Sequence, residues 1–159
     1  MEKQKILVIA LAGLFAAAIS NSCNENGSSN NNETGDVYVA GYECEGNDKY
    51  IVKIWKNDKV LRTFTDNIIV KSIFVSGNDV YMAGYNKSIA TVWKNGQVVH
   101  TLTDECDIDG IFISGNDLYV AGREWEAGSN SSAGKIWKNG QVLYAFPHTD
   151  IFSIFVKQE

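Results

Sequence analysis

The sequence predicts an all-β domain made of three copies of a four-stranded antiparallel unit. Three short segments recur in step along the chain, and matching positions lie 38 to 44 residues apart. They are Asp36–Gly41, Asp79–Gly84 and Asp117–Gly122; Trp55–Asn57, Trp93–Asn95 and Trp137–Asn139; and Ile73–Val75, Ile111–Ile113 and Ile154–Val156. A fixed period of this length is typical of architectures in which one supersecondary unit is stacked on the next.

The middle copy shows the four expected strands of the unit. They are Ser72–Ser76, Asp79–Tyr85, Ile89–Lys94 and Gln97–Thr103. The joint between the first two strands and the joint between the last two contain Asn and Gly, the residues that tight hairpins need for positive φ. Each unit is therefore predicted to be an antiparallel meander, with its variable loop between the second and third strands.

The apolar pattern indicates how the units pack. The first two strands of each unit are apolar on nearly every residue, whereas the fourth carries polar residues such as Arg62 and His100. Buried inner strands and a wetter outer edge are typical of the blades of a β-propeller. The repeat resembles that of bacterial propeller lipoproteins with many copies of a VYVAGY, WKNG and SIFVSGND unit, over residues 36–156.

The resemblance implies a propeller-type domain over residues 36–159, with three four-stranded antiparallel blades. Three blades are fewer than the roughly four to eight of known rings, so we expect an open arc or half of a six-bladed ring. A β-trefoil, which also has three copies of four strands, is the alternative. Pairing of Ile151–Val156 with Asp36–Gly41 would complete a third blade from the two ends of the domain. An arc leaves two apolar faces in water, so the sequence predicts self-association, for example as a homodimer.

The N-terminal residues 1–22 are predicted to be a signal peptide. Lys3 and Lys5 precede an apolar stretch, Ile6–Ile19, that is shorter than the roughly 20 residues needed to span a bilayer. The segment resembles a bacterial lipoprotein signal, with Ser20 where a leucine is typical, and this implies lipid attachment at Cys23. Ordinary secretion with cleavage before Cys23 is the alternative.

A polar tether is expected over residues 23–35, because nothing after Cys23 in this stretch is apolar. The lipoprotein resemblance, with Asn24 in place of an acidic residue after the cysteine, implies the outer membrane. Without residues 1–22 the chain keeps 12 Lys and Arg against 18 Asp and Glu. This acidic balance argues against nucleic acid as a partner.

The expected binding face is the end of the domain that carries the variable loops, because loops on a rigid scaffold often bind ligands. Trp125 is the tryptophan outside the repeat and could stack on a sugar or an apolar side chain. Tyr42, Tyr85 and Arg123 occupy equivalent positions after each Ala-Gly and could line the same face. The alternatives are that Trp125 covers its own loop and that the other three side chains pack at strand ends. Acidic residues are numerous in these loops.

The sequence contains further tryptophans, cysteines and an acidic connector that could have a functional role. Trp55, Trp93 and Trp137 recur with the fold and are expected to be packing residues. Cys44 and Cys106 fall at the loop end, where export would permit a disulfide. The connector Glu105–Gly110 resembles the start of a calcium loop, but Asn116 stands where the bidentate glutamate is needed, so no metal is predicted. No catalytic motif or cofactor signature is present.

The sequence thus favours a binding or scaffold module, anchored to the outer membrane by lipid, with a glycan or protein as ligand. A polysaccharide hydrolase or lyase that uses Asp107 or Glu124 is one alternative. A non-functional remnant of a longer propeller is the other.

Overall fold

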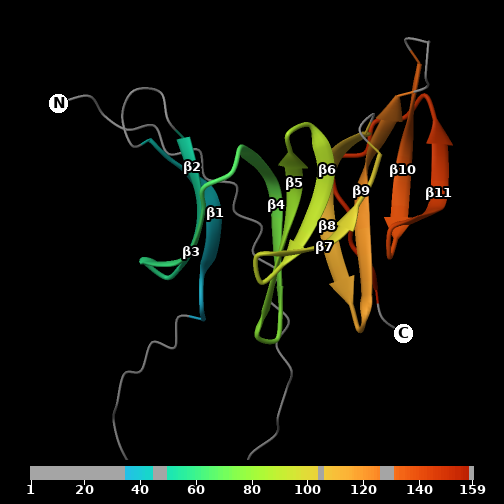
Figure 1. The fold of residues 1–159 in the computed structure, drawn as a ribbon. Helices are drawn as coiled ribbons and strands as arrows, with labels where there is room; N and C mark the ends of the chain where they lie inside the picture. Colours follow the sequence, from blue (N-terminus) through green and yellow to red (C-terminus); the bar gives the residue numbers. More distant parts are fainter. Residues whose placement is uncertain (1–34, 45–49, 104–105, 126–130, 158–159) are drawn as a thin grey trace, which may run out of the picture.

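The computed structural model describes residues 35–44, 50–103, 106–125 and 131–157, and these form three antiparallel sheets arranged side by side (Figure 1). The predicted signal peptide, Cys23 and all of the predicted tether except Gly35 lie outside the described residues. Among the described residues, no helix is long and apolar enough to cross a membrane. The predicted all-β character is confirmed.

The three sheets have three, four and four strands, and each is a meander in which strands consecutive in sequence are hydrogen-bonded neighbours. The first contains β1 (Tyr38–Cys44), β2 (Tyr50–Lys56) and β3 (Lys59–Phe64). The second contains β4 (Ile68–Ser76), β5 (Asp79–Asn86), β6 (Ile89–Lys94) and β7 (Gln97–Thr101). The third contains β8 (Cys106–Ser114), β9 (Asp117–Trp125), β10 (Ser132–Lys138) and β11 (Gln141–Pro147).

The last hairpin of each sheet is built in the same way. Asn57, Asn95 and Asn139 all adopt φ of 51°, as the predicted turns require. Each asparagine Oδ1 accepts a hydrogen bond from the backbone N–H at the start of the neighbouring strand, namely that of Val37, Val80 or Leu118, at 2.9 to 3.0 Å. The asparagine thereby ties the turn to the second strand of the unit and fixes the register of the meander.

A β-bulge recurs in the first strand of the second and third sheets. The pairing of β4 with β5 shifts between Val70 and Ser72, and the pairing of β8 with β9 shifts between Ile108 and Gly110. The bulged strand comes so close to its neighbour that a Cβ on Gly84 would lie 1.9 Å from the Ile69 carbonyl oxygen. The bulge therefore requires a glycine at this position.

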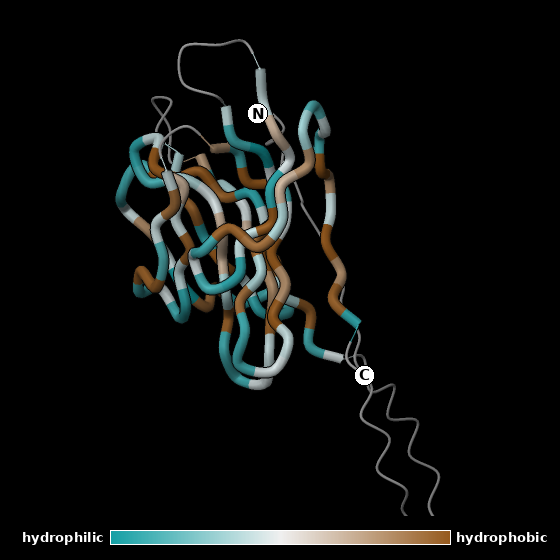
Figure 2. The backbone as a smooth tube through the Cα atoms, turned by 90° about the vertical axis from the view of Figure 1, so that its right-hand side faces the viewer, coloured by the Kyte–Doolittle hydropathy of each residue, from teal (hydrophilic) through white to brown (hydrophobic). Residues whose placement is uncertain are grey.

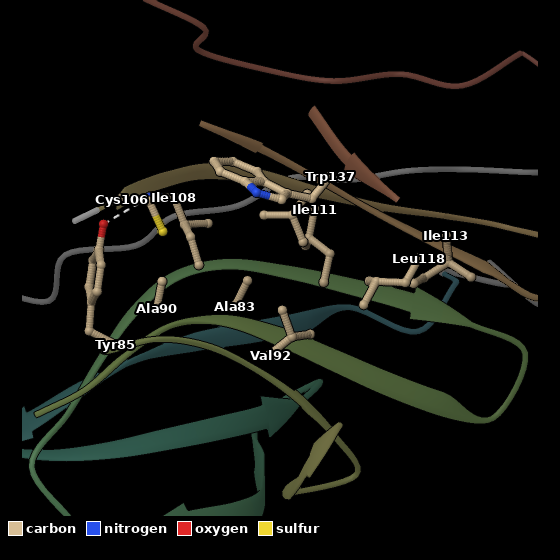
Figure 3. Packing of buried hydrophobic residues seen from close by; sticks show 11 residues of the cluster. Ala83, Tyr85, Ala90, Val92, Cys106, Ile108, Ile111, Ile113, Leu118 and Trp137 are labelled. Carbon is tan, nitrogen blue, oxygen red and sulfur yellow. Dashed lines mark hydrogen bonds between the residues drawn. The ribbon is translucent and has the colours of Figure 1, made fainter. Parts of the chain in front are cut away.

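Apolar side chains between adjacent sheets form the core. One buried cluster joins the first sheet to the second, with Ala40, Val52 and Ile54 from the first facing residues such as Met82 and Trp93 of the second. The other cluster joins the second sheet to the third. Figure 3 shows Ala83 and Val92 of the second sheet facing Ile108, Ile111 and Trp137 of the third. Hydrophobic residues concentrate along the strands and hydrophilic residues at the hairpin turns (Figure 2).

The segment after β11 differs from the expectation. Residues 151–157 form no strand, and β1 pairs only with β2 among the described residues, so the first sheet has three strands rather than four. The expected pairing of Ile151–Val156 with Asp36–Gly41 is absent because the segment instead lies on the third sheet. There the Phe155 ring contacts the Phe112 ring at 5.2 Å between centroids, and Ile154 lies beside Gly110. The first and third sheets lie on opposite sides of the second (Figure 1).

Candidate functional site

Three side chains occupy equivalent positions at the loop end, and two of them, Tyr42 and Tyr85, connect one sheet to the next. Tyr42 Oη accepts a hydrogen bond from the Val70 N–H at 3.1 Å. Tyr85 Oη accepts one from the Ile108 N–H at 2.8 Å, and Figure 3 shows these two residues. Both N–H groups belong to the residue that precedes the bulge of the next first strand. The two tyrosines, proposed from the sequence as ligand-binding residues, therefore have an intramolecular role as clamps between sheets.

Arg123 occupies the same position in the third sheet and makes a denser set of contacts. Its Nε and Nη2 donate to Asp107 Oδ2 at 3.0 and 2.8 Å, and its Nη1 donates to Asp150 Oδ1 at 3.0 Å. Tyr85 completes the network by donating to Asp107 Oδ1 at 3.0 Å. The side chain of Arg123 thus bridges β8 and the segment after β11, which the sequence had not connected.

Burial and the hydrogen bonds from Arg123 shift the pKa values of the titratable groups in this cluster. Burial opposes ionisation of Asp107, but hydrogen bonds from Arg123 and Tyr85 outweigh it and lower the pKa of Asp107 below its ordinary value. Burial raises the pKa of Asp109, and burial also raises the pKa of the Tyr85 hydroxyl. At neutral pH, Asp107 and Arg123 therefore form a fixed ion pair beside a neutral tyrosine.

Trp125 is the exposed aromatic side chain next to this cluster. It ends β9 and is 42% exposed, and the guanidinium carbon of Arg123 lies 5.0 Å from the centre of its ring. A guanidinium in this position is attracted by the π-face and limits the movement of the ring. Because Asp107 and Asp150 hold Arg123, the indole is presented on an ordered support.

Ion pairs compensate the acidic residues at the loop end more than the sequence indicates. Lys53 pairs with Glu43 in the first sheet, and Lys135 pairs with Glu124 in the third. Glu124 also accepts a hydrogen bond from Thr103 Oγ1 at 3.0 Å. The two lysines each stand two residues before a repeat tryptophan, and this shared position was the signal that sequence reasoning missed. Several other acidic loop residues lie outside the described residues, namely Glu45, Asp48, Asp104, Glu105 and Glu126.

The hairpin end carries a second set of ion pairs that the sequence analysis did not find. Asp36, Asp79 and Asp117 each pair with the lysine of the Trp-Lys-Asn segment, Lys56, Lys94 and Lys138 respectively, at 2.8 Å. Each lysine Nζ also lies 5.4 to 5.5 Å from the centre of a tyrosine ring. The recurrence of Asp and Lys in step was the available signal. These contacts neutralise the lysines of the hairpin end.

The remaining sequence candidates are placed as follows. Trp93 and Trp137 are buried in the two clusters, and Trp55 is half-buried. Cys44 is exposed in the first sheet, whereas Cys106 is buried in the third and donates to the Thr103 carbonyl oxygen at 3.1 Å. The structure forms no disulfide between them. In the described part of the chain, no His, Cys, Asp and Glu side chains gather into a group that could hold a metal ion.

Comparison with known proteins does not assign the site, because no family model matches the chain and no curated protein matches its sequence.

Proposed function

We propose that this chain is an outer-membrane lipoprotein whose domain is a propeller-type binding module, with a glycan as ligand at the loop end. The observation that carries the proposal is the exposed Trp125 ring, supported by Arg123 and by two aspartates. A sugar ring presents C–H groups on one face and hydroxyls at its edge. The first suits an indole face, and the second suits the carboxylates and guanidinium beside it.

Three features support propeller-type packing. The innermost strands contact one another from sheet to sheet, since β4 contacts β1 and β8 contacts β4. The outer strands β3, β7 and β11 are largely exposed. Hydrogen-bonded strand neighbours lie within one sheet throughout the described residues, whereas a trefoil closes a barrel with pairs between repeats. Blades stacked in this way bring their variable loops to one end.

Binding is favoured over hydrolysis by the contacts of the two carboxylates named for catalysis. Asp107 is held by Arg123 and Tyr85, and Glu124 is held by Lys135 and Thr103. The hydrogen bonds to Asp107 lower its pKa, which suits this carboxylate to accept hydrogen bonds from sugar hydroxyls and not to act as the protonated general acid that glycoside hydrolysis requires.

Trp125→Ala is expected to weaken glycan binding by on the order of tenfold, because an aromatic anchor at a binding site contributes about this much. The measurement is titration calorimetry against oligosaccharides selected from an array screen with the wild-type chain. Val142→Ala, which shortens an exposed side chain on β11 of the same sheet, is the matched control and should bind as wild type. Unchanged affinity in Trp125→Ala would remove the site. Binding of proteins but no glycan in the screen would change the ligand class.

The lipid anchor has its own test. The lipoprotein resemblance of residues 1–23 supports attachment at Cys23. Cys23→Ser is expected to move the chain from the membrane fraction to the soluble fraction and to abolish labelling by a palmitate analogue, because the acyl chains are what hold it there. Cys44→Ser is the matched control and should change neither result. A Cys23→Ser chain that stays labelled and membrane-bound would contradict the anchor.

A further inference from the structure

The outer edge of β1 has the features of an edge that receives another strand. In the second and third sheets, β5 and β9 each pair on one side with a bulged first strand, β4 or β8. β1 is the equivalent of β5 and β9, yet among the described residues its only hydrogen-bonded neighbour is β2. An unpaired edge of this kind presents a row of backbone donors and acceptors to a further chain.

Gly41 shows which kind of strand this edge accepts. Its equivalents Gly84 and Gly122 face bulged strands whose carbonyl oxygens would lie 1.9 Å from any Cβ at the glycine. On its other side, β1 pairs with β2 through Gly41 and Lys53. β1 thus carries the glycine that a bulged first strand needs.

Residues 150–156 have the sequence of such a strand. Asp150 and Ile151 match Asp107 and Ile108, and Ile154, Phe155 and Val156 match Ile111, Phe112 and Ile113. Phe152 then falls at the bulge position and is 81% exposed. The segment stacks on the third sheet as β8 stacks on the second. The ring centroids of Phe74 and Phe112 lie 4.8 Å apart between the second and third sheets, and those of Phe112 and Phe155 lie 5.2 Å apart between the third sheet and the segment. It lies in the place of a first strand but has no second strand beside it among the described residues.

The two outer sheet faces complement this arrangement. The first sheet exposes Val37 and leaves Trp55 half-buried, although the equivalent Val80 and Trp93 are covered in the second sheet. The third sheet exposes Tyr144 and Phe146. β1 and residues 151–157 lie at opposite ends of the row of sheets (Figure 1).

We propose that residues 150–156 of one copy pair with the outer edge of β1 of a second copy and complete its first sheet as a four-stranded sheet. The register follows from the pairs of β4 with β5, in which Ile73 faces Met82 and Val75 faces Val80. Transferred to the new pair, Ile154 faces Val39 and Val156 faces Val37. The contact is head-to-tail, so two copies related in this way can close a ring. It does not depend on the ligand proposed above.

Disulfide cross-linking tests the register directly. Two full-length chains with different tags are co-expressed, both with Cys44→Ser and Cys106→Ser, one with Val39→Cys and the other with Ile154→Cys. They are extracted in mild detergent and oxidised. Facing residues in an antiparallel pair lie within reach of a disulfide. We expect a cross-linked product that contains both tags. The matched control combines Glu43→Cys with Val156→Cys, which this register separates by about 20 Å, and should give at most a tenth of the product.

Two further variants make the result decisive. Gly41→Ala, added to the Val39→Cys chain, should reduce the product to the control level, because its methyl group would meet the incoming bulge. A single chain with both Val39→Cys and Ile154→Cys should form covalent dimers or larger species. A cross-linked monomer from that chain would show closure within one copy and overturn the proposal. So would equal yields from the facing and control pairs, or full yield with Gly41→Ala.

Discussion

Gly122→Ala is expected to lower the free energy of unfolding by about 3 kcal/mol or more, one of the largest effects of a single methyl group in this domain. A Cβ on Gly122 would lie 1.9 Å from the carbonyl oxygen of Asp107, 2.9 Å from its carbonyl carbon and 3.1 Å from the Cα of Ile108. All three are backbone atoms, so no side-chain rotation can relieve the contact. The strand β8 would have to move away from β9, or the bulge would have to be lost.

Movement of β8 would also disturb the contact with the second sheet. Ile108 is fully buried in the cluster between these sheets, and its N–H is the donor to Tyr85. A buried N–H that loses its acceptor costs about 1 to 3 kcal/mol. The same reasoning applies to Gly84→Ala, whose Cβ would meet the Ile69 carbonyl oxygen at the same distance.

Gly110→Ala is the matched control for Gly122→Ala, since both glycines lie in the β8–β9 pair. The nearest atom to a Cβ on Gly110 is Ile154 Cγ2 at 3.5 Å, an ordinary contact, and the change should cost less than about 1 kcal/mol. Urea unfolding followed by circular dichroism measures both variants. Equal stability of Gly122→Ala and Gly110→Ala would show that β8 does not approach β9 as described.

The strands and turns could be predicted from the sequence because the repeat makes each copy a check on the others. Turn residues such as Asn95 and Gly96 recur in step with apolar runs, so the boundaries of β5, β6 and β7 agree with the structure to within two residues. β4 begins four residues earlier than predicted, at Ile68 instead of Ser72. The bulges could not be predicted in this way. Each bulge is one extra residue in a strand that faces a glycine of its neighbour. An extra residue of this kind can be recognised only when the register of the two strands is known.

The sequence indicated which candidate residues are neighbours better than it indicated their contacts. Arg123 and Trp125 do lie together at the loop end, as expected from their places after the third Ala-Gly. The roles of Tyr42 and Tyr85 depend on how one sheet sits on the next, since their hydroxyls accept hydrogen bonds from the neighbouring sheet. Packing between sheets is a long-range property that no local pattern specifies. For the same reason, the position of residues 151–157 on the third sheet was not predicted.

Trp93→Ala and Trp137→Ala are each expected to lower the free energy of unfolding by about 3 to 5 kcal/mol. Each indole is only 3% exposed and packs between two sheets, Trp93 between the first and second and Trp137 between the second and third. Truncation leaves a cavity that rigid strands on both sides cannot fill, so the lost transfer energy and the cavity both contribute. Trp125→Ala should cost less than about 1 kcal/mol, because that residue is 42% exposed at the end of β9 and belongs to neither buried cluster between the sheets.

The three sheets stack so that each covers an apolar face of the next. The most direct test of this stacking is to measure the free energy of unfolding of these three alanine variants in urea. Large and similar losses are predicted for Trp93→Ala and Trp137→Ala, with little change for Trp125→Ala. Losses at Trp93 and Trp137 no greater than at Trp125 would mean that the sheets do not cover one another, and would contradict the arrangement described here.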